Sequence, residues 1–318
     1  MIKPYLSVVI PFCNEEAVIE ELSKSLVSVM DKSKVNYEII YVDDGSSDNT
    51  YEEIEKAYEK YENIKVIRLG KNYGQSTALS AGIDHALGEI LVLMDGDMQH
   101  SPEDIPKFIE KINEGYDIVS GWRKNRSDNF FNRRLPSWIA NRIASKISGV
   151  NIHDFGATFK AYKSEILKSV RLYDSLHRFI PALASWTGAR ICEIEIQSGQ
   201  RKSGKSKYGI SRTLVVVLDL IAINFLLKYK SKPLQFFGKI GLLFSFSGFL
   251  GLMALSLGWA FFELNMIENR GTLLLAALAI IIGIQFIASG LVAELISRTY
   301  YETQNKKLYY IKTQKIRE

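Results

Sequence analysis

Cysteine is scarce in this sequence of 318 residues, which contains only Cys13 and Cys192. Two distant thiols provide neither a disulfide framework nor the spacing of a zinc site, and they suit a reducing compartment. The four histidines show no zinc-ligand spacing either. The first residues lead directly into a strand-like run, so no cleavable signal peptide is expected. These absences argue against a disulfide-stabilised secreted domain and against a zinc site.

Two common phosphate-binding loops are also absent. The sequence contains no G-x-x-x-x-G-K-[ST] loop, and no G-x-G-x-x-G follows its first strand-like run. A bound nucleotide must therefore be held in another way. The net charge of +5 is modest, so charge gives no reason to expect a nucleic-acid partner.

Charge disappears from two long segments near the end of the chain. Ile240–Phe262 and Leu273–Ala293 are runs of 23 and 21 residues without a charged side chain. About 20 apolar residues are needed to cross a bilayer core, and a helix without a polar face is a poor candidate for a soluble surface. Two membrane spans are expected, with buried core helices as the alternative. Two lone spans could also pack between protomers of a homo-oligomer.

The flanks of these runs predict their orientation. Cations precede the first run and follow the second, whereas the short turn between them carries only Arg270 beside two glutamates. The positive-inside rule then places both termini and the N-terminal domain in the cytoplasm of an inner or plasma membrane. We expect four parts: a catalytic domain over 1–210, an interfacial helix or linker over 211–235, a transmembrane hairpin over 236–298 and a basic tail over 299–318.

The N-terminal part alternates strand-like and helix-like segments. Its strand-like runs are almost wholly apolar, as expected for strands covered on both faces. Repeated strand–helix units predict an α/β domain with a mostly parallel sheet. The expected strands are Leu6–Pro11, Tyr37–Asp43, Ile64–Leu69, Ile90–Met94 and Asp117–Gly121.

Polar clusters follow the first four of these strands. In such a sheet the ligand lies beyond the carboxyl ends of the strands, where the clusters converge. Asp95 and Asp97 form a D-G-D turn, and paired carboxylates suit Mg²⁺ or Mn²⁺, with Gln99 placed to add another oxygen. Asp43 could accept a hydrogen bond from a base or ribose hydroxyl, and Lys71 could reach a phosphate. The sequence therefore predicts a metal-assisted nucleotide site.

The motifs V-V-I-P-F-C-N-E-E, V-D-D-G-S-S-D, G-K-N-Y-G-Q and M-D-G-D-M-Q-H resemble those of the family 2 inverting glycosyltransferases. The resemblance covers roughly residues 5–210 and is strongest to dolichyl-phosphate mannose synthases and bacterial polyprenyl-phosphate glycosyltransferases. It implies a GT-A nucleotide-diphospho-sugar transferase fold. Among the matching positions, it implies that the nucleotide pocket is lined by Pro11, Asn14, Glu16, Asp43 and Gly45. It also implies that the metal and donor diphosphate are held by Asp95, Asp97 and Gln99.

Basic residues after the fifth strand suggest the acceptor side. Phe130–Ser148 reads as a basic amphipathic helix that could lie in a membrane interface, with an ordinary surface helix as the alternative. The loop 201–208 carries four cations, Lys205 among them, just upstream of the membrane segments, which favours capture of a lipid phosphate. By resemblance, the acceptor phosphate would be held by Arg123, Arg133, Ser137 and Arg201. The apolar segment Thr213–Leu227 is too short to span, so it reads as an interfacial helix or a buried core helix.

The expected reaction is transfer of a hexose from a nucleotide-diphosphate sugar to a polyisoprenyl phosphate such as undecaprenyl phosphate. By the same resemblance, the expected catalytic residues are Asp97, Arg123 and Arg201, together with Asp154, which matches an acidic position of the family, as a base or an orienting carboxylate. A simple helix-end cap is the alternative for Asp154. The two-span layout resembles bacterial bactoprenol glucosyltransferases and favours UDP-glucose, with GDP-mannose as an alternative donor. A processive polysaccharide synthase would carry Q-x-x-R-W, which is absent. A non-enzymatic scaffold and transfer to protein or diacylglycerol are further alternatives.

Overall fold

The computed structural model describes residues 3–124, 135–170, 174–197, 199, 233–262, 269–303 and 310–316. The chain divides into two compact units, one of Met1–Ile223 with Lys307–Glu318 and one of Asn224–Lys306. The first unit contains the sheet and the second contains two long helices. The expected basic tail over 299–318 is therefore divided, because its residues up to Lys306 belong to the second unit and Lys307–Glu318 belong to the first.

The described strands of the first unit form one sheet of eight strands in the order β7-β5-β6-β4-β1-β2-β3-β8. Its centre is parallel, because β1 pairs with both β2 and β4, and β2 pairs with β3. Strand β6 is antiparallel to β4 and β5, β8 is antiparallel to β3, and β7 is parallel to β5. The strands are β1 Leu6–Phe12, β2 Tyr37–Asp43, β3 Ile64–Leu69, β4 Ile90–Leu93, β5 Ile118–Trp122, β6 Lys160–Lys163, β7 Ile191–Glu195 and β8 Ile311–Lys315.

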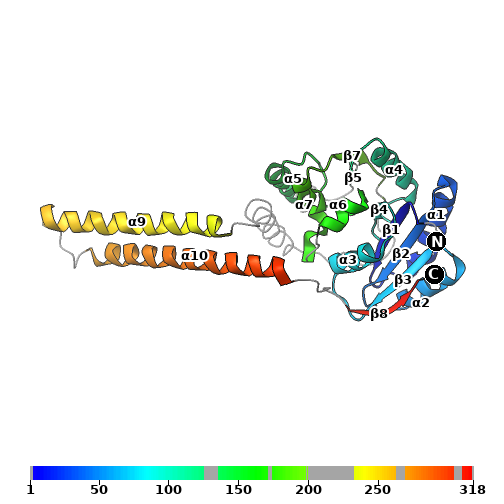
Figure 1. Cartoon of the computed structure of the whole chain (residues 1–318), viewed down its shortest axis with the longest axis horizontal. Helices are drawn as coiled ribbons and strands as arrows, with labels where there is room; N and C mark the ends of the chain where they lie inside the picture. Colours follow the sequence, from blue (N-terminus) through cyan, green and yellow to red (C-terminus); the bar gives the residue numbers. More distant parts are fainter. Residues whose placement is uncertain are drawn as a thin grey trace. The chain divides into compact units, whose positions relative to one another are not determined.

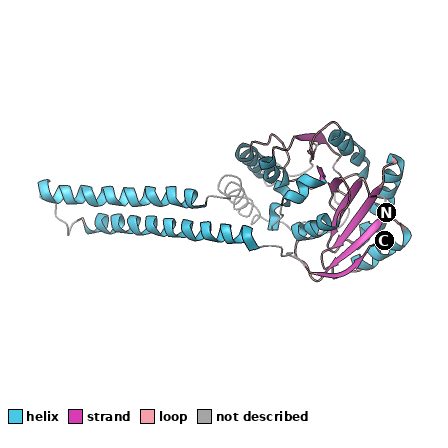
Figure 2. Cartoon of the chain, in the orientation of Figure 1, coloured by secondary structure: helices cyan, strands magenta, loops and turns pink. Residues whose placement is uncertain are grey.

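Helices cover both faces of this sheet (Figures 1 and 2). Successive side chains of a strand point to opposite faces, so Val8 and Ile10 join one buried core while Val9 joins the other. The first core includes α1, α2 and α4, and the second includes α3, α6 and α7. The helices are α1 Ile19–Ser33, α2 Thr50–Lys60, α3 Gln75–His85, α4 Ile105–Asn113, α5 Leu135–Ser148, α6 Ser164–Ser169 and α7 Ile180–Ala184, with short 3₁₀ turns at η1 Glu16–Val18, η2 Pro102–Asp104, η4 Asp174–Phe179 and η5 Ser185–Thr187.

The expected elements agree with the structure over most of this sheet. Tyr37–Asp43 and Ile64–Leu69 form strands with the expected bounds. The first and fourth expected strands differ from the observed ones by one residue at one end, and the fifth by one residue at each end. The period of apolar residues along α1 explains its packing, because Ile19, Leu22 and Leu26 are all fully buried on one side of the helix. The confirmed fold is a mixed, mostly parallel α/β sheet.

The second unit consists of α9 Pro233–Phe262 and α10 Arg270–Thr303. Leu234–Phe261 and Arg270–Ala293 are apolar enough to cross a membrane, with mean hydropathies of 2.0 and 2.4. Only 17% of each apolar window is buried inside the structure, which a core helix of a soluble protein would not tolerate.

The two helices approach each other through small residues. A β-carbon added to Gly241 would lie 2.5 Å from the carbonyl oxygen of Gly283, and one added to Gly248 would lie 2.5 Å from that of Ala276. Small residues that allow such close approach are typical of helix packing in membranes. The packing therefore agrees with a transmembrane hairpin.

Candidate active site

Polar turns follow the carboxyl ends of the four central strands β1, β2, β3 and β4, and these strands are neighbours in the sheet. We call residues 11–16, 43–47, 70–75 and 95–99 the strand-end cluster. Hydrogen bonds between the turns join them into one surface at this edge, as the sequence predicted.

The turns after β1 and β2 are joined through Asn14. Its backbone N–H donates to Ser46 Oγ at 3.1 Å, and its side-chain Oδ1 accepts from the Ser47 N–H at 2.8 Å. The backbone of Asn14 is in the left-handed region (φ 57°), which asparagine tolerates better than most residues. Glu16 Oε2 accepts from the Asn49 N–H at 3.0 Å. Asn14 and Glu16 therefore fix the shape of this part of the edge.

Asp43 and Asp44 at the end of β2 are both buried. Asp43 Oδ1 accepts from the Ser46 N–H at 3.0 Å, and Asp43 Oδ2 lies 3.4 Å from Arg68 Nε. Asp44 accepts from the backbone N–H groups of Tyr73 at 2.7 Å and Gly74 at 2.9 Å. Asp44 thereby fastens the turn after β3 to the turn after β2.

Gly45 allows these two turns to approach closely. A β-carbon at this position would lie 2.3 Å from the carbonyl carbon of Lys71, and the residue adopts a φ of 63°. Lys71 itself is exposed, with its ammonium 5.1 Å from the centre of the Tyr73 ring. The lysine is thus at the exposed rim of the strand-end cluster.

The D-G-D turn after β4 packs against the end of β1. A β-carbon on Gly96 would lie 2.5 Å from the Phe12 ring. Asp95 Oδ1 accepts from Gln75 Nε2 at 2.6 Å, and Asp97 Oδ1 accepts from the Gln99 N–H at 3.1 Å. Burial raises the pKa of Asp95 above its ordinary value, and the nearby Arg123 guanidinium is the largest influence that opposes this rise.

The chemistry of this turn fits a hard divalent cation. Within the described residues, no group of three or more His, Cys, Asp and Glu side chains could form a metal cage. Mg²⁺ is commonly held by one or two carboxylates and completes its shell with water and substrate phosphates. Asp95 and Asp97 supply such a pair, and a cation would offset the cost of burying the Asp95 carboxylate.

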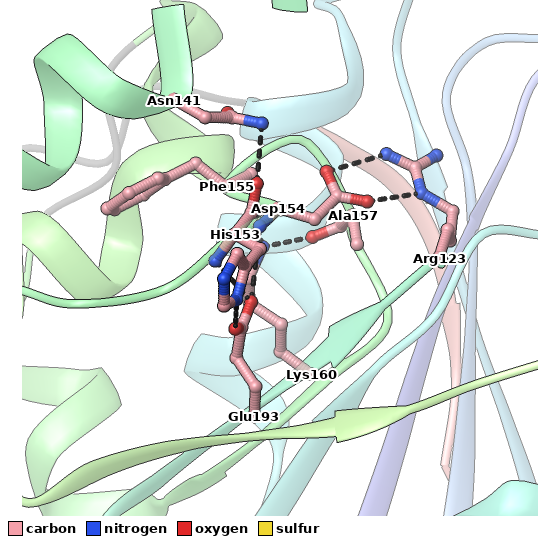
Figure 3. Close-up of polar contacts among 8 residues, drawn as sticks. All are labelled: Arg123, Asn141, His153, Asp154, Phe155, Ala157, Lys160 and Glu193. Carbon is pink, nitrogen blue, oxygen red and sulfur yellow. Dashed lines mark hydrogen bonds and ion pairs between the residues drawn. The ribbon is translucent and has the colours of Figure 1, made fainter. Parts of the chain in front are cut away.

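A second group of ionisable side chains surrounds Arg123, which directly follows β5 (Figure 3). We call Arg123, His153, Asp154, Lys160 and Glu193 the Arg123 cluster. Arg123 Nε donates to Asp154 Oδ2 at 2.8 Å, and its terminal nitrogen donates to Oδ1 at 3.0 Å. The two side chains are only 12% and 4% exposed. Such a bidentate pair fixes the plane of the guanidinium.

The segment that carries Asp154 is held from two sides. Glu193 on β7 accepts from the backbone N–H groups of His153 at 2.7 Å and Asp154 at 3.1 Å. From β6, the ammonium of Lys160 donates to the carbonyl oxygens of Phe155 and Ala157 (Figure 3). Lys160 is fully buried, and burial lowers its pKa to about 7.

The two clusters lie within electrostatic range of each other. Arg123 lowers the pKa of Asp95, and both Asp97 and Asp154 act on the pKa of His100. His100 is itself buried, and burial lowers its pKa to about 4. The D-G-D turn and the arginine that was expected to contact a phosphate are therefore close enough to interact electrostatically.

The structure describes most of the residues predicted for this site. It brings together Pro11, Asn14, Glu16, Asp43, Gly45, Lys71, Asp95, Asp97 and Gln99 at the edge of the sheet, and Arg123 with Asp154 beside it. Arg133, Arg201 and Lys205 lie outside the described residues, as do the side chain of Ser137 and the segment Thr213–Leu227.

Several residues of the site were not predicted. Asp44 and Gln75 stand inside motifs that were recognised, so their neighbours gave a signal. Arg178 acts on the Asp95 carboxylate from η4, and Lys160 and Glu193 act on the Asp154 segment from β6 and β7. No local pattern distinguishes these three residues, because their partners are distant in the sequence.

Helix α5 presents an amphipathic surface. Trp138 and Ile143 are 59% and 41% exposed, and the Arg142 guanidinium lies 5.6 Å from the Trp138 ring centre. Ala144 is fully buried. Exposed aromatic and basic side chains on one helix are typical of a membrane-interface segment.

The family described as "Glycosyl transferase family 2" matches residues 7–171, which include the whole strand-end cluster and all of the Arg123 cluster except Glu193. The chain belongs to this family. It is therefore a glycosyltransferase, and the resemblance seen in its motifs is confirmed.

Two relatives match this glycosyltransferase over nearly its whole length. Dodecaprenyl-phosphate galacturonate synthase of Rhizobium johnstonii is 39% identical over 313 residues, which cover 96% of this chain and 92% of the relative. Undecaprenyl-phosphate 4-deoxy-4-formamido-L-arabinose transferase of Edwardsiella ictaluri is 35% identical over 312 residues, which cover 96% and 93%. Together with the two apolar helices, this likeness indicates a membrane protein.

Solved structures of another glycosyltransferase share the fold. Glucosyl-3-phosphoglycerate synthase from Mycobacterium tuberculosis, solved with Mn²⁺, UDP and glucosyl-3-phosphoglycerate, matches with a TM-score of 0.53 at 19% identity and covers 70% of this chain and 79% of that one. Its complex with Mg²⁺ and UDP matches with a TM-score of 0.53 at 20% identity, covering 70% and 78%. The likeness confirms the GT-A fold of the first unit.

Proposed function

We propose that this enzyme transfers a sugar from a nucleoside-diphosphate sugar to the phosphate of a polyisoprenyl lipid, forming a lipid-linked sugar. The observation that carries this proposal is that Arg123, oriented by its bidentate pair with Asp154, lies within electrostatic range of the D-G-D turn. A site for a metal-bound diphosphate thus adjoins a guanidinium suited to a second phosphate. Relatives named for transfer to dodecaprenyl and undecaprenyl phosphate support the same acceptor.

In this reaction, the strand-end cluster binds the donor. Asn14, Glu16, Asp43 and Gly45 shape the nucleotide pocket with Pro11, and Lys71 contacts a phosphate at the rim. Asp95 and Asp97, with Gln99, would hold Mg²⁺ or Mn²⁺ against the diphosphate. When bound, the cation supplies positive charge that stabilises the departing nucleoside diphosphate.

The Arg123 cluster orients the acceptor. A lipid phosphate is already anionic near neutral pH, since its second pKa is about 6, so it needs little help from a base. Both carboxylate oxygens of Asp154 accept from Arg123, which favours an orienting role for Asp154 over proton abstraction. Arg133, Ser137, Arg201 and Lys205 complete the phosphate site in this proposal.

The bond changes follow from this placement. An oxygen of the lipid phosphate attacks the anomeric carbon, the bond from that carbon to the donor diphosphate breaks, and the nucleoside diphosphate leaves with both electrons. A single displacement inverts the anomeric configuration. Placing the two phosphates on opposite sides of the sugar is the main task of the protein.

The same proposal includes the membrane arrangement. The cations that flank the two apolar helices support a cytoplasmic location for the catalytic unit and both termini of the chain. There the exposed face of α5 would contact the bilayer that delivers the lipid. Exposed apolar residues on α9 and α10 also favour packing between protomers in a homo-oligomer.

The proposal also specifies the sugar donor. UDP-glucose is the donor that the two-span layout favours, whereas the relatives are named for galacturonate and 4-deoxy-4-formamido-L-arabinose. The test is a donor screen with the purified full-length protein, undecaprenyl phosphate and Mg²⁺ or Mn²⁺. The panel contains UDP-glucose, UDP-galacturonate, the UDP-linked formamido sugar and GDP-mannose.

Mass spectrometry of the lipid fraction identifies any sugar-linked polyprenyl phosphate that is formed. We expect one donor to give a phosphate-linked sugar on the polyprenol, and that product should disappear in Asp97→Ala. Products on protein or diacylglycerol, or no lipid-linked product from any donor, would contradict the proposal.

A further inference from the structure

The strand that follows the second apolar helix in the chain returns to the catalytic unit. Strand β8 pairs antiparallel with β3, with Arg68 opposite Thr313 and Leu69 opposite Ile311. Without β8, β3 would be the open edge of the donor half of the sheet, and exposed edges are commonly covered in native proteins. Ile311–Lys315 therefore adds a strand beside the proposed nucleotide pocket.

The first residue of this segment contacts the turn after β3. The Gly70 N–H donates to the Tyr310 carbonyl oxygen at 3.0 Å. A β-carbon on Gly70 would lie 2.9 Å from the Tyr310 ring, so a side chain at position 70 would require the ring to shift. Gly70 directly precedes Lys71, and the backbone N–H groups of Tyr73 and Gly74 in the same turn donate to Asp44. Tyr310 thus packs on the segment that forms one wall of the strand-end cluster.

The far end of β8 connects to the same cluster through α2. Lys315 Nζ lies 2.5 Å from Glu55 Oε1, and Glu55 is hydrogen-bonded to the Tyr51 side chain. The Tyr51 ring centre lies 4.0 Å from the Arg68 guanidinium. Arg68 in turn lies 3.4 Å from the buried Asp43 carboxylate. A continuous series of contacts therefore joins the C-terminal strand to Asp43.

We propose that β8 is a positioning element of the donor pocket, with Tyr310 and Lys315 as its positioning residues. It holds the turn 70–74 through Tyr310 and the Arg68–Asp43 pair through Lys315, so that both are in position before the nucleotide binds. The inference rests on the proposed donor role of the strand-end cluster. It makes the segment after the membrane helices part of nucleotide recognition.

The alternative is that β8 only covers an edge and stabilises the sheet. The two roles differ in what they do to substrates. If β8 only covers the edge, a mutation in it lowers stability and affects both substrates alike. If β8 positions the donor pocket, the same mutation raises the KM for the donor more than the KM for the lipid. The strand offers a matched control in Lys312, another lysine of the same strand, which is exposed whereas Lys315 is half-buried.

The experiment compares full-length wild type with Tyr310→Ala, Lys315→Met, the double variant, and Lys312→Met as control. UDP affinity in the presence of Mg²⁺ is measured by titration calorimetry, and both KM values come from initial rates. We expect the double variant to bind UDP about five- to tenfold more weakly, with the lipid KM changed less than about twofold. Lys312→Met should match wild type, and Tyr310→Phe and Lys315→Arg should restore most of the affinity.

Thermal unfolding shows whether each variant is folded. Wild-type UDP affinity in the folded double variant would overturn the inference, as would an equal rise of both KM values. If the double variant does not fold, the single variants are compared in the same way. Failure of the wild-type protein to bind any nucleotide would instead refute the proposed function, which separates the two failures.

Discussion

The strand-end cluster and the Arg123 cluster hold their charges in different ways. In the strand-end cluster, Asp43, Asp44 and Glu16 accept hydrogen bonds from backbone N–H groups of tight turns. In the Arg123 cluster, the guanidinium is held by the Asp154 carboxylate, which comes from a distant part of the chain. Backbone-held carboxylates keep their positions as long as the turns exist. A charge held by another side chain depends on that one partner.

This difference predicts different responses to mutation. Removing one member of a buried ion pair leaves an uncompensated charge, which typically costs about 3–5 kcal/mol. Removing a carboxylate that accepts from backbone N–H groups leaves unpaired donors and loosens a turn, which costs about 1–3 kcal/mol. The first change should affect the acceptor side, and the second should affect the donor side.

Asp97→Ala should have the largest effect on transfer. It removes half of the carboxylate pair that would hold the cation, and a loss of at least about 100-fold in kcat is expected. Radiolabelled sugar transfer to undecaprenyl phosphate measures the rate, and metal-dependent UDP binding should fall in parallel. Turnover equal to wild type would remove the metal assignment from this turn.

Breaking the Arg123–Asp154 pair should have the second-largest effect on transfer. Arg123→Ala and Asp154→Asn should each raise the KM for the lipid phosphate by about tenfold or more, because the guanidinium is absent or misaligned. The combined variant should lose less stability than the sum of the two single losses, since neither charge remains unpaired. A double-mutant cycle on thermal unfolding checks this coupling, and simple additivity would speak against the pair as a unit.

Asp44→Asn should have a smaller effect on the donor side. The amide cannot accept from both Tyr73 and Gly74 in the way the carboxylate does. The turn 70–74 should loosen, and the donor KM should rise by about tenfold with the lipid KM unchanged. Steady-state rates with each substrate varied in turn measure both constants. A larger change in the lipid KM would contradict the division between the clusters.

The smallest effect expected is a pH dependence of stability that arises from Lys160. Burial lowers its pKa to about 7, so between about pH 7 and pH 10 the unfolded chain binds more protons at this residue. Its contribution therefore makes the folded state more stable as pH rises through that window, by at most about 1.4 kcal/mol per pH unit. Lys160→Met should reduce the slope of the unfolding free energy against pH between pH 7 and 9. An unchanged slope would argue against a contribution of Lys160 to this pH dependence.

The two clusters also differ in how much of them the sequence reveals. The strand-end cluster follows apolar runs that predict strands, and each turn carries its polar residues in consecutive positions. The Arg123–Asp154 pair joins residues 31 positions apart, and Glu193 and Lys160 come from still other strands. Single motifs identify Arg123 and Asp154 as candidates, but only the tertiary structure pairs them.

The same reasoning explains why β8 was missed. Ile311–Lys315 contains a single apolar residue, Ile311, and two lysines, so it reads as part of a solvated basic tail. Its strand character comes from pairing with β3, more than 240 positions earlier in the chain. Local propensity carries little information about such a non-local edge pairing. The two apolar helices, in contrast, are evident from composition alone.

The most direct test of the two-part site measures both KM values in Asp44→Asn and in Arg123→Ala under one set of conditions. The account predicts that the first variant raises only the donor KM and that the second raises chiefly the lipid KM. If each variant raised both constants equally, the separate roles of the strand-end cluster and the Arg123 cluster would be wrong.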